Sequence, residues 1–181
     1  MRQVLAALLL CFTCAVSAAE IEVKNTALTL GEEGWLLSAD FSIELNARLE
    51  DVVSRGVPLY FAAEFALRRP RWYWVDEDVA IQTRSYRLSY HALTRQYRLS
   101  SGSLHQNFNT LDEALRILSR LRDWHVAEKN QLKAGEPYLA ALRLRLDLTQ
   151  LPKPLQVTAI GSKEWNLVSD WRRWNHIVGA P

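Results

Sequence analysis

Between residues 68 and 74, three guanidinium groups and three aromatic rings fall within seven positions. The charged and aromatic members are Arg68, Arg69, Arg71, Trp72, Tyr73 and Trp74. Rings with cationic neighbours can stack on sugars or bases, hold an anionic headgroup or anchor a partner protein, because Trp, Tyr and Arg dominate binding energies. The segment is therefore a candidate binding element.

A second group of the same composition lies near the carboxyl end, at Trp171-Arg172-Arg173-Trp174. Two interpretations are open. In one, both groups form a single ligand- or partner-binding surface made of Arg69, Arg71, Trp72, Trp74, Trp171, Arg172, Arg173 and Trp174. In the other, the tryptophans fill the ends of a core and the arginines stack on them or pair with nearby acids. The usual burial of large rings favours the second.

Recognisable catalytic motifs are missing from the sequence. It contains no glycine-rich phosphate loop, no Gly-x-Ser-x-Gly elbow and no His-Glu-x-x-His pair. The expectation is a protein without catalytic residues and without a cofactor. A hydrolase whose site assembles from distant groups, such as Glu64, Asp76 and His105, is kept as an alternative.

The sequence also lacks metal-ligating side chains at the spacing of a known metal site. None of the four histidines has a second histidine or a cysteine three or four residues away, so no metal site is predicted. The run Asp76-Glu77-Asp78 lacks the spaced acids and the glycine of a cation-binding loop. We interpret it as a solvated turn that pairs with arginines.

The first 19 residues have the order of a secretory signal peptide, namely Arg2, the apolar run 4–16 and the small residues 17–19. The run is shorter than the roughly 20 apolar residues that cross a bilayer. We expect cleavage to leave one β-rich domain over residues 20–181, with no transmembrane segment. Both cysteines, Cys11 and Cys14, lie in the leader, and a disulfide-free exported domain favours a bacterial periplasm.

The charge of the chain is nearly balanced, with 22 basic and 20 acidic residues. A protein that neutralises nucleic-acid phosphates normally carries a marked basic excess. Nucleic acid is therefore not an expected partner.

Alternation of apolar and polar residues predicts seven strands, over residues 21–30, 35–45, 57–68, 79–90, 95–101, 138–149 and 165–171. Asn46 and Gly56 bracket a predicted helix over 47–55. Thr110 and Glu113 form a capping box that starts a second helix, which we extend to Leu121, with Arg120 and Arg122 at its negative end.

Short strands with turns between them and two short helices predict a mainly β fold, an antiparallel β-sandwich-like domain. The alternative is an α+β arrangement in which the helices pack on a single sheet.

Several runs of the chain resemble proteobacterial exported proteins that carry a domain of unknown function, DUF4390. The matching runs are 55–61, 69–74, 86–90, 93–97, 151–154 and 165–171. Members of that family are often encoded beside a nitrogen-regulation type sensor kinase. The resemblance therefore implies a role near the periplasmic part of such a sensor, and it implies no activity.

The function expected from these observations is a non-enzymatic periplasmic binding or interaction module that modulates a membrane sensor kinase. The alternatives are a carrier or binder of a glycan, a lipid or an anionic ligand, and the hydrolase named above.

Overall fold

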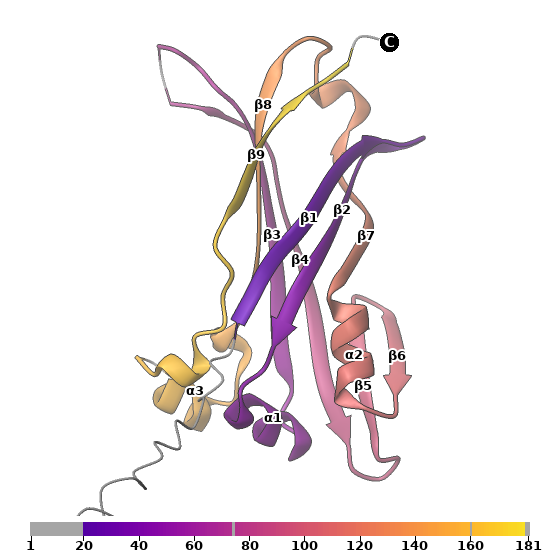
Figure 1. Cartoon of the computed structure of the whole chain (residues 1–181), viewed down its shortest axis with the longest axis vertical. Helices are drawn as coiled ribbons and strands as arrows, with labels where there is room; N and C mark the ends of the chain where they lie inside the picture. The colour runs from indigo at the N-terminus through magenta and orange to yellow at the C-terminus, as the bar shows by residue number, and fades with distance from the viewer. Residues whose placement is uncertain (1–19, 74, 160, 180–181) are drawn as a thin grey trace, which may run out of the picture.

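The computed structural model describes residues 20–73, 75–159 and 161–179, so the expected signal peptide and Trp74 lie outside the described residues. Within these residues, nine strands form two antiparallel sheets (Figure 1). The small sheet has the order β1 (Glu20–Leu30), β2 (Gly34–Glu44), β7 (Arg120–Glu128). The large sheet has the order β6 (Leu104–Phe108), β5 (Gln96–Ser101), β4 (Glu77–His91), β3 (Leu59–Arg69), β8 (Pro137–Leu146), β9 (Arg172–Ile177).

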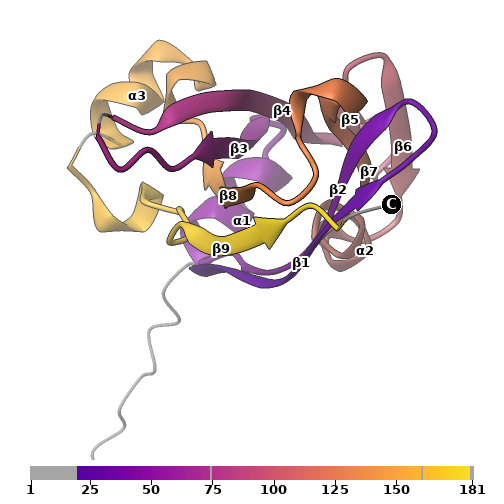
Figure 2. The ribbon, with the colours of Figure 1, turned by 90° about the horizontal axis from the view of Figure 1, so that it is seen from above.

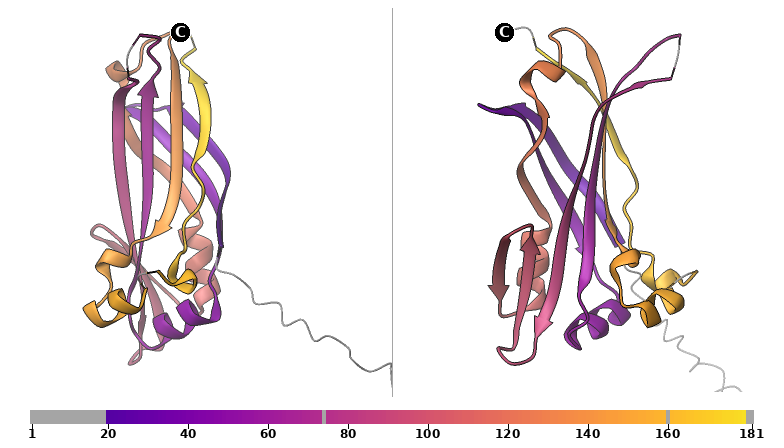
Figure 3. Two further views of the ribbon diagram at one scale, coloured as in Figure 1. Left: turned by 90° about the vertical axis from the view of Figure 1, so that its left-hand side faces the viewer. Right: turned by 180° about the vertical axis from the view of Figure 1, so that it is seen from behind.

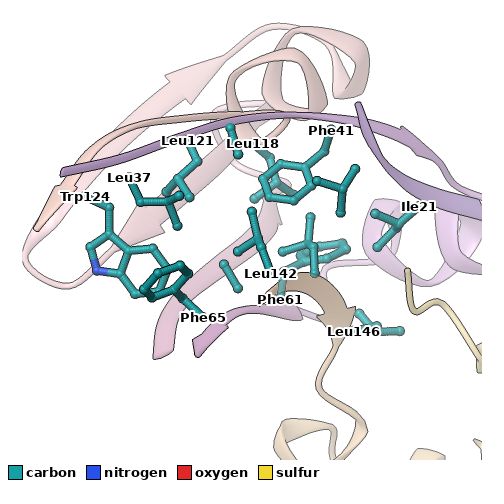
Figure 4. Close-up of a cluster of buried hydrophobic side chains, with 14 of the residues drawn as sticks. Ile21, Leu37, Phe41, Phe61, Phe65, Leu118, Leu121, Trp124, Leu142 and Leu146 are labelled. Atoms are coloured by element: carbon teal, nitrogen blue, oxygen red, sulfur yellow. The ribbon is translucent and has the colours of Figure 1, made fainter. Parts of the chain in front are cut away.

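The two sheets pack face to face because each has one apolar face. Along β3 and β8 every second side chain is buried, from Leu59 to Leu67 and from Tyr138 to Leu146. These residues meet Leu37, Leu121 and Trp124 of the small sheet in one core (Figure 4). The sandwich-like prediction is confirmed, and the single-sheet alternative is wrong (Figure 2).

Three α-helices accompany the strands in the described part of the chain: α1 (Ala47–Ser54), α2 (Leu111–Leu118) and α3 (Lys153–Ala159). The Asn46 side chain accepts a hydrogen bond from the Leu49 amide, and the Thr110 hydroxyl accepts one from the Glu113 amide, as their capping positions predict. Helix α2 carries the chain from β6 in the large sheet to β7 in the small one.

The predicted second helix is too long, because the chain leaves α2 at Ser119 and becomes β7. Strand β2 needs a partner on its second edge, and the Phe41 amide donates to the Ser119 carbonyl at 2.8 Å. Arg120 and Arg122 therefore lie on a strand. The Arg122 guanidinium donates to the Ala39 carbonyl and pairs with Asp40.

Three other elements differ from prediction. Strand β6 and helix α3 were not expected, and the last strand runs over 172–177 instead of 165–171. Helix α3 begins at a proline-rich segment because the first turn of a helix needs no amide donors, and the Pro152 carbonyl accepts from the Leu155 amide. The alternation before β9 is real, since Trp165, Leu167 and Ser169 are all buried.

The two ends of the sandwich differ. Helices α1 and α3 lie at one end, and the β3–β4 loop lies at the other. There the ends of β3 and β4 bend away from β8 and β9 (Figure 3).

Within the described residues, no helix is both long enough and apolar enough to cross a bilayer.

Candidate functional site

The projecting end of the β3–β4 hairpin carries the first arginine and tryptophan group. Trp72 is 95% exposed, Tyr73 is 64% exposed and Val75 is 76% exposed. The Trp72 and Tyr73 rings pack edge to face with centroids 5.3 Å apart. We call Trp72, Tyr73 and Val75 the aromatic tip.

Ion pairs hold the base of this tip. Glu77 Oε2 accepts from Arg69 Nη2 at 2.6 Å and from Arg71 Nη2 at 2.5 Å. Arg69 Nη1 also donates to Glu136 at 2.9 Å, which ties the hairpin to the start of β8. The hydrogen bond from Arg71, and then that from Arg69, holds the pKa of the Glu77 carboxyl below its ordinary value. We call Arg69, Arg71, Glu77 and Glu136 the brace.

The second group, at β9, lies in the body of the sandwich. Trp174 is half-buried with its ring centroid 6.4 Å from that of the core residue Phe65. Trp171 is half-buried beneath the Arg143 guanidinium, whose Cζ lies 4.4 Å from the ring centroid. Arg172 and Arg173 are exposed.

Among the described residues, most members of the two groups have partners within the domain. Arg69 and Arg71 are held by acids, and Trp171 and Trp174 pack against other side chains of the domain. Trp72 has neither role and is left in solvent with Tyr73.

Both groups fall inside one sequence match. Residues 18–175 match the family described as Domain of unknown function (DUF4390). The chain belongs to this family. No curated protein and no solved structure matches it. The resemblance noted in the sequence is thus confirmed at the level of the DUF4390 family.

Sequence reasoning missed a charge cluster on the outer face of the large sheet of this DUF4390 domain. Glu64 on β3 accepts from Arg143 Nε at 2.6 Å and from Arg145 Nε at 2.7 Å, both on β8. Burial alone would raise the pKa of Glu64, but the hydrogen bonds from Arg145 and Arg143 outweigh it and lower the pKa. The outward-facing positions 143 and 145 of β8 are both arginine, yet the sequence does not reveal that β3 lies beside them.

The three residues of the hydrolase alternative do not share a site. Glu64 is on β3 and His105 is on β6, with β4 and β5 between them. Three strand spacings separate them by at least about 14 Å. Asp76 lies in the hairpin loop, where its carboxylate accepts from the Arg71 amide at 3.4 Å. Across the described residues, no group of three or more His, Cys, Asp or Glu side chains is placed to hold a metal ion.

Removing the central acid of the brace tests its structural role. In the Glu77→Gln variant, Arg69 and Arg71 lose their shared carboxylate, so the loop should open more often while the sandwich stays folded. We expect trypsin to cleave the Arg71–Trp72 bond several times faster than in the parent chain. Glu33→Gln, in the exposed β1–β2 turn, is the matched control. An unchanged cleavage rate for Glu77→Gln would contradict the assignment.

Proposed function

We propose that this DUF4390 chain is exported to the periplasm and acts there as a non-enzymatic interaction module of a membrane sensor kinase. The observation that carries the binding role, as distinct from the choice of partner, is the aromatic tip. A contiguous group of exposed rings at a projecting end is costly to keep in water, and such groups mark binding surfaces.

The brace supports a binding role for the tip. Six charged residues of the hairpin, three arginines and three acids between Arg68 and Asp78, hold the loop that presents the rings. A loop held in one conformation loses less entropy on binding than a flexible one. The ion pairs that hold this loop in one conformation are therefore consistent with a docking role.

The compartment and the partner come from the sequence. The leader-like residues 1–19 and the cysteine-free remainder support export. The sensor kinase follows from the resemblance to exported proteins encoded beside such kinases. A periplasmic module could contact the extracytoplasmic part of such a membrane sensor.

The test uses the full chain expressed with its own leader and purified from the periplasmic fraction. Intact mass should show loss of residues 1–19. Titration against the full-length sensor in lipid nanodiscs should give a dissociation constant at least about tenfold lower than titration against empty discs, a difference of about 1.4 kcal/mol. Equal binding to both kinds of disc would remove the sensor from the proposal. An unprocessed chain in the cytoplasmic fraction would remove the periplasm.

A further inference from the structure

We infer that the aromatic tip inserts into the lipid–water interface of a bilayer, and so holds the module against the membrane beside its protein partner. The inference rests on the proposed function only in treating the tip as a docking element. It names the receptor of the tip as the zwitterionic headgroup layer of a bilayer, and not a pocket of the sensor.

The side chains of the tip have the chemistry of this layer. Trp and Tyr combine a large apolar ring with one polar group, and they concentrate where lipid meets water. Val75 adds an apolar side chain, and none of the three tip residues carries a charge. The tip can therefore enter the headgroup region without removing a charge from water.

The charges around the tip argue against attraction to an anionic or an acidic surface. Arg68 pairs with Asp78 at 2.7 Å, and Arg69 and Arg71 share Glu77. From Arg68 to Asp78 the three arginines are matched by three acids. A segment that binds anionic lipid or acidic protein would leave its cationic groups free. The charge pattern thus complements a neutral, zwitterionic surface.

The size of the tip argues against a protein pocket as its receptor. A large aromatic side chain offers roughly 150–250 Å². With the observed exposures, the three side chains together offer about 400–500 Å². A stable protein complex buries about 800 Å² on each partner, with hydrogen bonds and charges around the apolar centre. The tip supplies about half this area, and the brace uses the charges that would form such a rim.

The shape of the hairpin agrees with contact to a flat surface. The ends of β3 and β4 bend away from the neighbouring ends of β8 and β9 in every view that separates them (Figure 3). The hairpin end is therefore set apart sideways from the neighbouring strand ends, and it can touch a plane that is tilted toward its own side of the sandwich.

The experiment measures binding of the purified full chain, its processed amino terminus verified by mass, to protein-free phosphatidylcholine vesicles by sedimentation. The variants are Trp72→Ala, Tyr73→Ala and the double variant. Leu93→Ala is the matched control, because Leu93 is a fully exposed apolar residue at the opposite end of β4. We expect the double variant to lower the partition coefficient by roughly tenfold or more, and Leu93→Ala to leave it within about twofold.

Two further measurements distinguish insertion of the tip into the lipid interface from electrostatic binding to the vesicle surface. Binding should change little between about 50 and 500 mM salt, because no net charge drives it. Lipids brominated near the headgroup should quench tryptophan emission in the parent chain, and Trp72→Phe should keep the binding while losing much of the quenching. These variants change exposed side chains, so their unfolding curves should match that of the parent.

Each outcome decides between the proposals. Vesicle binding that the tip substitutions do not reduce, or no vesicle binding at all, overturns the inference. If the tip instead proves necessary only for nanodiscs that contain the sensor, its receptor is a protein pocket, and the proposed function stands without the inference. If tip-dependent binding to vesicles is found and the sensor adds nothing, the inference stands and the sensor role fails.

Discussion

Replacing Phe65 by alanine is expected to lower the free energy of unfolding by about 3–5 kcal/mol, because it removes a large buried ring and leaves a cavity. Phe65 is 1% exposed at the middle of β3. The centroid of its ring lies 6.4 Å from the ring centroid of Trp124 in the small sheet and 6.4 Å from that of Trp174 in β9. The ring therefore joins both layers and the edge strand.

Urea unfolding followed by circular dichroism measures this loss. Domains of this size have total stabilities of about 5–15 kcal/mol, so the variant should unfold at a much lower urea concentration. Leu93→Ala removes an apolar side chain that is exposed in the β4–β5 turn, and it should change the stability by less than about 0.5 kcal/mol. A loss below about 1 kcal/mol for Phe65→Ala would show that the two layers do not meet at this ring.

The strand cores could be predicted because alternation is a local property of the sequence. In β3 and β8 the apolar residues recur every second position, and every one of those positions is buried. No neighbouring strand has to be known to derive this pattern. The capping side chains of α1 and α2 were predicted for the same reason, since a cap and its amide lie three residues apart.

The end of α2 could not be predicted locally. Leu118 and Leu121 are spaced as on a helix, and both are in fact buried. The burial of Leu121 is achieved on β7 instead, where it faces Ala39 of β2. Pairing with a strand about 80 residues earlier in the chain decided the structure there, and a single sequence does not report that pairing.

Whether each tryptophan is exposed or packed in the domain could not be predicted from the sequence, for a related reason. Trp72 and Trp174 have similar neighbours in the sequence, yet one is in solvent and the other packs on Phe65. The difference depends on where the strands end, because Trp72 lies beyond β3 and Trp174 lies within β9. The interpretation that arginines pair with nearby acids is supported for Arg69 and Arg71.

Two clusters of charged side chains, the brace and the Glu64 cluster, are built in the same way. The brace sits at the hairpin end and the Glu64 cluster sits on the open face of the large sheet, and in both a carboxylate is shared by two guanidiniums. A shared carboxylate orders two long side chains with one acid. An arginine-rich chain that is nearly neutral can in this way keep its strands paired without a large free positive charge.

The Glu64 cluster gives the second large expected effect. The Glu64 side chain is 19% exposed and joins β3 to β8 through two arginines. In Glu64→Gln the charge is lost while the shape is kept, and Arg143 and Arg145 remain side by side without their common carboxylate. Partly buried charged hydrogen bonds are worth about 1–3 kcal/mol, so we expect a loss of this size near neutral pH.

The pH dependence of this loss provides the decisive control. The folded-state pKa of Glu64 is below its ordinary 4.5, so the unfolded chain takes up the proton first as the solution is acidified. The stabilisation by ionised Glu64 is complete above pH 4.5 and is lost as the pH falls through the lowered folded-state pKa. The parent and Glu64→Gln should therefore differ most near neutrality and converge in acid, whereas Glu33→Gln should follow the parent near neutral pH. A difference in unfolding free energy that stays constant on acidification would mean that packing, and not the ion pairs, accounts for the effect of Glu64.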